Sequence, residues 1–244
     1  MGLFFYRESP TTEAILDFET ASGWPGTMTD FDMIGTLTTV SHSDSPLSTN
    51  PLSNGGIYAE SMTPSGSKAA KLYFNPTSYG GAFYNIPDTK VISARACLRY
   101  WGFPFSNPIY ITAKDTANFS NDFTNAIGYR LGIDQNKITL YGNANTILKI
   151  GTSNTTNNLW YSLKMEVTPL GASGDRIVCY RETSPGSEVW SSTIDGTVFD
   201  ITVPTASLDF APWGNNNRNG ISVAINDATT VFVDNINFIT YNAP

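Results

Sequence analysis

An alternating run at residues 159–167 constrains the fold of this chain more than any other feature. Apolar side chains occupy every second position and mostly polar ones stand between them: the first set is Leu159, Tyr161, Leu163, Met165 and Val167, and the second is Trp160, Ser162, Lys164 and Glu166. Side chains of a β-strand alternate between the two faces of a sheet, so this period predicts a half-buried strand. Turn-forming residues 169–175 follow, and then a second predicted strand at 176–181. We predict that the two runs pair as the central hairpin of a β-sandwich.

The remaining chain repeats this pattern of short strands and turns. Residues 93–103 alternate in the same way, and we expect residues 108–113 to pair with them. Residues 127–133 and 137–141 predict a hairpin through the turn at 134–136. No stretch has a convincing helical period. The sequence therefore predicts an all-β protein of two packed antiparallel sheets, with an extended arm at 1–12 and one domain at 13–244.

The composition argues against two classes of partner. Charged residues make up only 14% of the 244 residues, and the formal net charge is −7. Binding to nucleic acid needs clustered Lys and Arg that neutralise phosphates, and an anionic membrane surface attracts the same residues. We therefore expect neither nucleic acid nor a membrane among the partners.

Cys97 and Cys179 are the only cysteines, and both lie inside predicted strands. Two buried thiols are the simpler expectation. A disulfide would require the two strands to be neighbours, with the Cα atoms within about 7 Å of each other. Their spacing does not resemble that of a zinc site.

Residues 1–12 are predicted to form an N-terminal anchoring arm. The segment lacks the basic start and the long apolar run of a signal peptide, and no apolar stretch in the chain reaches the roughly 20 residues of a membrane helix. Leu3, Phe4, Phe5 and Tyr6 would each gain about 1.5–3 kcal/mol on burial. We expect this apolar run to bind a partner, either another copy of the chain or another protein of an assembled particle. The alternative is an arm packed on its own domain.

Two features of the strand order point to a known superfamily. One is the succession of the hairpin at 127–141, the strand with Trp160 and the strand at 176–181; the other is a first strand with Phe18 and Glu19, matched by a last strand at 233–236. Together they resemble the concanavalin A-like and jelly-roll lectin superfamily, which includes laminin-G-like domains and carbohydrate-binding modules. The resemblance implies that the first and last strands lie side by side. Similar sandwiches also serve as adhesion or decoration modules on phage particles.

The resemblance also implies a structural calcium ion held by acids of the first and last strands. Calcium prefers six to eight oxygen ligands, many of them carboxylates. Four residues could supply such oxygens if the two strands meet: Asp17, Glu19, Asp234 and Asn235. The simpler alternative is that these are solvated acids at a sheet edge.

No catalytic signature is present. Sandwich glucanases of similar fold carry a Glu-x-Asp-x-x-Glu strand, and Asp17-Phe18-Glu19 lacks that spacing. The only histidine, His42, lies in a Ser-rich stretch whose composition is that of a loop. A polar segment at 212–219 is a better candidate for sugar binding, through Trp213, Asn215 and Arg218. The alternative there is a Trp folded over the end of the sandwich.

These observations favour a non-enzymatic structural protein of an assembled particle. The most specific form of this hypothesis is a phage virion component, such as a capsid decoration protein, that is made in the host cytoplasm without a leader. Its partners would be other virion proteins, or itself, bound through residues 1–12. The alternative is a carbohydrate-binding module that recognises a surface glycan. A structural calcium ion is the one cofactor that the resemblance implies, and no other is expected.

Overall fold

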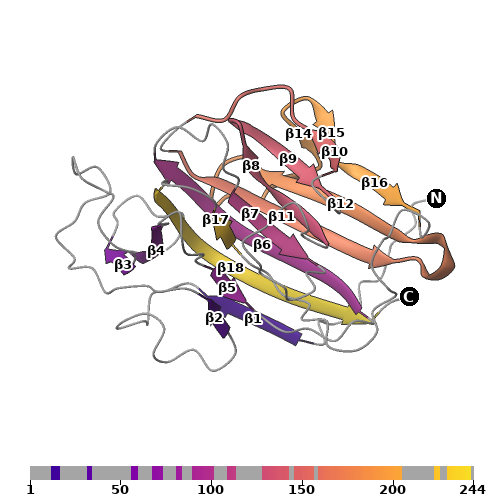
Figure 1. The fold of residues 1–244 in the computed structure, drawn as a ribbon, viewed down its shortest axis with the longest axis horizontal. Helices are drawn as coiled ribbons and strands as arrows, with labels where there is room; N and C mark the ends of the chain where they lie inside the picture. Colours follow the sequence, from indigo (N-terminus) through magenta and orange to yellow (C-terminus); the bar gives the residue numbers. More distant parts are fainter. Residues whose placement is uncertain are drawn as a thin grey trace.

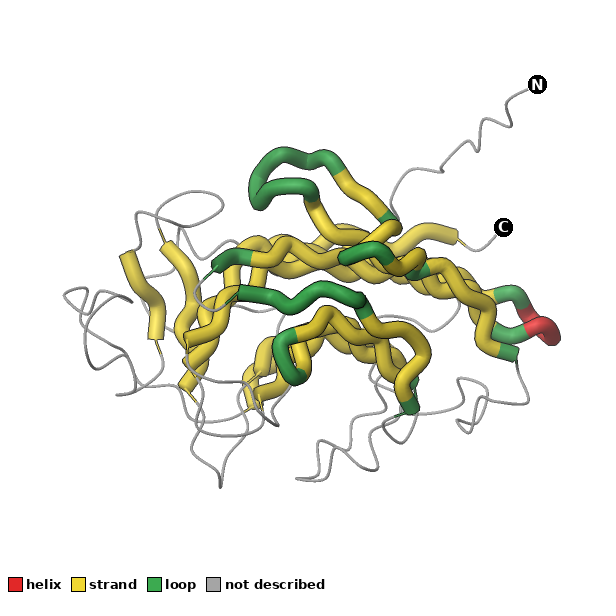
Figure 2. The backbone as a smooth tube through the Cα atoms, turned by 90° about the horizontal axis from the view of Figure 1, so that it is seen from above, coloured by secondary structure: helices red, strands yellow, loops and turns green. Residues whose placement is uncertain are grey.

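Two antiparallel sheets lie as stacked layers (Figure 1), and the layering is plain when the molecule is seen from above (Figure 2). The computed structural model describes residues 12–16, 32–34, 56–59, 68–73, 81–83, 90–101, 109–113, 128–142, 146–156, 159–204, 223–225 and 230–242. Among these residues the one helical element is the 3₁₀ helix Gly171–Ser173, and no helix there has the length and apolarity needed to cross a membrane. The predicted all-β sandwich is confirmed.

The larger sheet has nine strands. Seven of them follow one another across the sheet in the order β13 (Trp190–Ser191), β12 (Asp175–Glu182), β11 (Tyr161–Pro169), β6 (Lys90–Trp101), β18 (Thr230–Asn242), β4 (Lys68–Tyr73) and β3 (Gly56–Ala59). The other two are β1 (Thr12–Leu16), which pairs with β18, and β16 (Asp200–Val203), which pairs with β12. The predicted hairpin is the β11–β12 pair, in which Leu163 lies opposite Arg181.

The smaller sheet has five strands in the order β10 (Ile147–Ile150), β9 (Lys137–Tyr141), β8 (Tyr129–Asp134), β7 (Ile109–Ala113) and β17 (Val223–Ile225). The β8–β9 hairpin is confirmed, and Gln135 and Asn136 adopt the positive φ angles of 46° and 62° that its two-residue turn requires. Two short pairs complete the strands, β14 (Thr193–Ile194) with β15 (Thr197–Val198), and β2 (Asp32–Ile34) with β5 (Gly81–Phe83).

The core lies between the two sheets and follows from the alternation in the sequence. On β11, Leu163, Met165 and Val167 are fully buried. On the facing sheet, Leu131 of β8 and Leu140 of β9 are fully buried as well. Each such side chain contributes about 1.5–3 kcal/mol on burial, so this layer accounts for much of the stability.

The structure tests three further predictions made from the sequence. The first and last strands do lie side by side, because β1 pairs with β18 along Thr12–Leu16. The prediction that residues 108–113 pair with 93–103 is wrong, because β7 pairs with β8 and β17 in the other sheet. Leu159 precedes β11 and is 52% exposed, so the strand and its buried face begin only at Tyr161.

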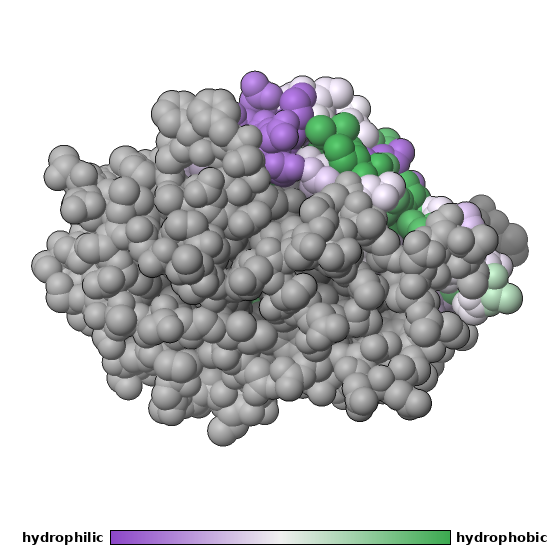
Figure 3. Space-filling model, viewed as in Figure 1, coloured by the Kyte–Doolittle hydropathy of each residue, from purple (hydrophilic) through white to green (hydrophobic). Residues whose placement is uncertain are grey.

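The small sheet ends in an exposed apolar edge at β10. Its pairing with β9 has a register irregularity between Ile147 and Lys149. Ile147 and Ile150 are 54% and 44% exposed. Figure 3 shows apolar atoms, in green, gathered over the region of β10, β14 and β15.

Candidate functional site

The face of the large sheet that points away from the small sheet is polar, and we call it the outer face. It carries the side chains that alternate with the core residues of β6, β11 and β12: Arg95, Cys97, Arg99, Ser162, Lys164, Glu166, Tyr180 and Glu182. Several are buried in spite of their charge, among them Arg99 at 0% and Glu182 at 3% exposure. Charged side chains are rarely buried without partners, so a polar face of this kind is a candidate for a specific role.

Strand register places two cations next to each other on this face. Lys164 of β11 lies directly opposite Arg95 of β6 on one side and Tyr180 of β12 on the other. Like charges directly opposite each other destabilise an antiparallel pair. An arrangement that costs stability and yet lies on the central strands is more typical of a binding surface than of a structural one.

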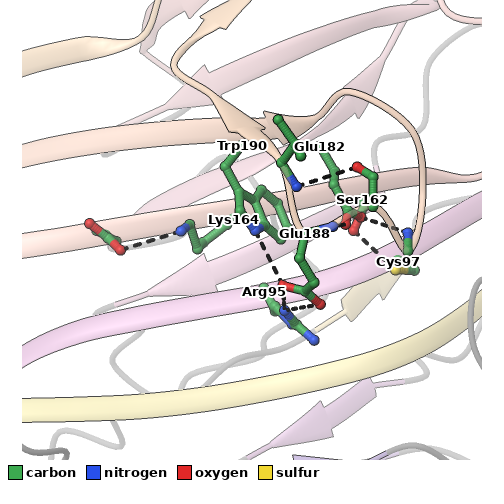
Figure 4. A network of polar contacts seen from close by, with 11 residues as sticks. Arg95, Cys97, Ser162, Lys164, Glu182, Glu188 and Trp190 are labelled. Carbon is green, nitrogen blue, oxygen red and sulfur yellow. Dashed lines mark hydrogen bonds and ion pairs between the residues drawn. The ribbon is translucent and has the colours of Figure 1, made fainter.

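Two aromatic rings lie against Lys164, and one of them also lies against Arg95. The Nζ atom of Lys164 lies 4.4 Å from the ring centroid of Tyr180 and 4.8 Å from that of Trp190. The guanidinium of Arg95 lies 5.9 Å from the Trp190 centroid. These are cation–π distances. We call the four residues Arg95, Trp190, Lys164 and Tyr180 the cation–aromatic row; three of them are labelled in Figure 4.

Two glutamates balance the charge of the cation–aromatic row. Glu166 lies 3.6 Å from the Lys164 ammonium and accepts a 3.3 Å hydrogen bond from the Tyr180 hydroxyl. Glu188 accepts hydrogen bonds of 3.0 Å at both carboxylate oxygens from a single nitrogen of Arg95, Nη1. The row and its counter-ions therefore form one connected network across β6, β11, β12 and β13.

A buried carboxylate shapes the loop that carries Glu188. Glu182, at the end of β12, accepts a 3.0 Å hydrogen bond from the backbone N–H of Gly186 and a short one from that of Glu188. Gly186 and Glu188 have positive φ angles of 84° and 55°. Positive φ is unfavourable for a residue with a side chain, so the Glu182 contacts hold the loop in a conformation that it would otherwise leave. Figure 4 shows Glu182 within the curve of this loop.

Cys97 and Ser162 lie beside the row on the same face, with Sγ and Oγ 3.2 Å apart. Burial raises the pKa of the Cys97 thiol to about 12. Cys179 is also a free and buried thiol, as predicted, and burial raises its pKa well above the usual value. It lies on the core face of β12, two strands from β6, so the two sulfur atoms point to opposite sides of the sheet and cannot be bridged.

Most of the site residues predicted from the sequence lie outside the described residues. This holds for Leu3, Phe4, Phe5 and Tyr6 of the arm, for Asp17 and Glu19 of the calcium site, and for Trp213, Asn215 and Arg218 of the sugar site. Asp234 and Asn235 are described. The Asp234 side chain is fully buried and its Oδ1 accepts a 2.8 Å hydrogen bond from the Asn235 backbone N–H. Within the described ranges, no cluster of three or more His, Cys, Asp or Glu side chains could hold a metal ion.

The cation–aromatic row was not predicted from the sequence. The alternation of β6 and β11 does place Arg95 and Lys164 on the non-core face, and that signal was available. Their adjacency depends on β6 lying next to β11, and these strands are separated by the entire small-sheet hairpin in the chain. Trp190 enters the row from β13, which is too short to show any period.

Comparison with known proteins bears on the fold. The lectin UEA-II, solved with galactose, has a TM-score of 0.52 and 9% identity, over 96% of this chain and 100% of the lectin chain. A protein of unknown function from Shewanella oneidensis MR-1 has a TM-score of 0.51 and 13% identity, over 98% of this chain and 91% of the other. An alginate lyase from Aplysia kurodai has a TM-score of 0.47 and 12% identity, over 86% of this chain and 99% of the lyase.

No protein-family model matches the sequence, and no curated protein matches it. At identities this low the likeness is one of fold, and it agrees with the sheet order and the paired first and last strands. The chain is therefore an antiparallel β-sandwich with the concanavalin A-like fold.

Proposed function

We propose that this protein is a carbohydrate-binding module that binds its glycan on the cation–aromatic row. One observation carries the proposal: Lys164 lies opposite Arg95 in register and between the rings of Tyr180 and Trp190. Both rings are half-buried, which leaves part of each in contact with solvent.

The chemistry of the cation–aromatic row suits a sugar. The apolar C–H groups of a pyranose stack on an aromatic ring, and its hydroxyl groups accept hydrogen bonds from cations and donate them to carboxylates. Trp190 and Tyr180 offer rings, Lys164 and Arg95 offer donors, and Glu166 offers an acceptor, all from neighbouring strands. A few fixed polar groups around aromatic side chains are typical of a site that orients a small ligand.

The fold supports the same proposal by analogy. The lectin UEA-II shares the architecture and was solved with galactose. Fold alone does not determine function, so this likeness supports the proposal by analogy and the cation–aromatic row carries it. The hypothesis of a virion component depends on residues 1–12, whose apolar run lies outside the described residues, and it stays a prediction.

Glycan-array binding with purified protein tests the proposal. Trp190→Ala should weaken binding to any glycan that the wild type binds by about five- to thirtyfold, since losing an aromatic and cation–π platform costs about 1–2 kcal/mol. Trp213→Ala is the matched control, because Trp213 belongs to the sugar site predicted from the sequence. Loss of binding in Trp213→Ala with none in Trp190→Ala would move the site to residues 212–219 and contradict the proposal.

The non-enzymatic part of the proposal has a separate test. A library of polysaccharides is incubated with the protein, and new reducing ends and unsaturated products are measured. We expect binding without turnover. Turnover that Lys164→Met or Tyr180→Phe abolishes would show that the cation–aromatic row is an active site instead.

A further inference from the structure

The two counter-ions of the cation–aromatic row are held very differently. Glu166 contacts both Lys164 and Tyr180, and its side chain is only 11% exposed. The Glu188 side chain is 63% exposed and reaches Arg95 from a loop. Its remaining side-chain contact is a long one of 3.5 Å from the Trp190 ring N–H. Glu166 is therefore a fixed part of the row, whereas Glu188 can leave it.

The Arg95–Glu188 contact uses only part of what a guanidinium offers. Both carboxylate oxygens share Nη1, and among the described residues the other two nitrogens of Arg95 make no hydrogen bond. A carboxylate binds most strongly to arginine when two nitrogens donate in parallel to two oxygens. Exposed ion pairs, by contrast, contribute little to stability. A carboxylate that approaches along the fork would hold Arg95 better than Glu188 does.

We propose that the ligand of this module is an acidic glycan, and that a uronic acid carboxylate takes the place of Glu188 on Arg95. The inference rests on the proposed function, because it places the sugar on the same cation–aromatic row. In the free protein Glu188 stands in for the ligand carboxylate and keeps the adjacent cations Arg95 and Lys164 from repelling each other. On binding, the ligand supplies that negative charge.

The loop at 183–189 allows the Glu188 side chain to leave Arg95. Residues 183–189 are all exposed, so the Glu188 side chain can turn into water without uncovering any core. Glu182 meanwhile holds the loop through backbone N–H groups and not through the Glu188 carboxylate. The backbone of Glu188 thus stays fixed while its side chain moves.

The test compares an oligogalacturonate hexasaccharide with its fully methyl-esterified form, which has the same sugar rings without the charge. Binding is measured by calorimetry for wild type, Glu188→Gln and Arg95→Gln. Asp200→Asn is the matched control, because it removes the same charge from another exposed Arg–carboxylate pair on the same sheet. Thermal melts establish that each variant is folded.

We expect wild type to prefer the acid over the ester. Glu188→Gln should tighten binding of the acid by about two- to fivefold, as removal of a weak competing ion pair allows, and leave the ester unchanged. Arg95→Gln should abolish the preference, and Asp200→Asn should change nothing. If the folded Glu188→Gln binds the acid more weakly or equally, the inference is wrong. If wild type binds only neutral glycans through Trp190, the inference fails while the proposed function stands.

Discussion

The hydroxyl of Tyr129 donates a 2.8 Å hydrogen bond to Oδ2 of Asp175 and joins the two sheets through the core. Tyr129 belongs to β8 of the small sheet and Asp175 to β12 of the large one, and both are buried. Burial, followed by the nearby Asp175 charge, raises the pKa of Tyr129 well above its usual 10.0. The link is therefore made by a neutral phenol and a carboxylate.

Tyr129→Phe should lower the free energy of unfolding by about 1.5–3 kcal/mol, the usual contribution of a hydrogen bond to a charged group. The difference from wild type should shrink above about pH 10, because the unfolded chain ionises this phenol there while the folded chain does not. Urea unfolding at pH 7 and pH 10.5 measures both effects. Tyr180→Phe, which removes a hydroxyl from the half-buried surface, is the control and should cost less. A pH-independent difference would contradict the linkage.

Glu182→Ala should free the loop at 183–189. The variant removes the acceptor for the backbone N–H groups of Gly186 and Glu188, and a loss of about 1–3 kcal/mol is expected because these donors meet a buried carboxylate. Amide hydrogen exchange of the two residues should accelerate more than that of the β11–β12 ladder. Glu182→Gln keeps one acceptor oxygen and should lie between wild type and Glu182→Ala. Equal exchange in all three proteins would show that Glu182 does not hold the loop.

Neither thiol should react in the folded protein. Cys97 and Cys179 are free and buried, and burial raises the pKa of Cys97 to about 12. The thiolate is the reactive form, so Ellman's reagent at pH 8 should label no thiol in the native state and both after denaturation without reductant. If denaturation releases no thiol until reductant is added, the cysteines are linked and the assigned strand order is wrong.

The calcium site at Asp17, Glu19, Asp234 and Asn235 stays a prediction. The pairing of β1 with β18 ends at Leu16 opposite Ile236, close in sequence to both halves of the site. If the ion binds, a calcium concentration 100-fold above Kd should add about 2.7 kcal/mol of stability, and chelator should remove it. Melting temperatures with calcium and with EGTA, for wild type and Asp234→Asn, measure this. Identical wild-type melts would rule the site out.

The alternation of β11 was enough to predict a strand, its two faces and its hairpin partner. Those features are local, because the period of two fixes the face of each side chain and a short turn fixes the register with β12. The partner of β7 was predicted wrongly because strand pairing between the two sheets is not a local feature. β7 and β6 are consecutive in the chain, but the connection between them crosses from one sheet to the other.

The candidate site was harder to predict because no part of it is contiguous. Arg95, Lys164 and Tyr180 come from three strands, and only the strand order makes them neighbours. The residues that are close together in the sequence and suit a sugar lie instead in the polar segment around Trp213. The sequence did show which face of each strand is polar, and a correct strand order would have assembled the row.

The broken register at β10 has a consequence for how the sheet terminates. A flat outermost strand exposes unpaired N–H and C=O groups that can template a strand from another molecule. The register shift between Ile147 and Lys149 interrupts the regular spacing of the backbone N–H and C=O groups along β10. Lys149 also places a cationic side chain between the exposed Ile147 and Ile150. A sixth strand could pair with β10 only if it had a matching register shift. The irregularity therefore protects this exposed apolar edge against the addition of further strands and the growth of fibrils.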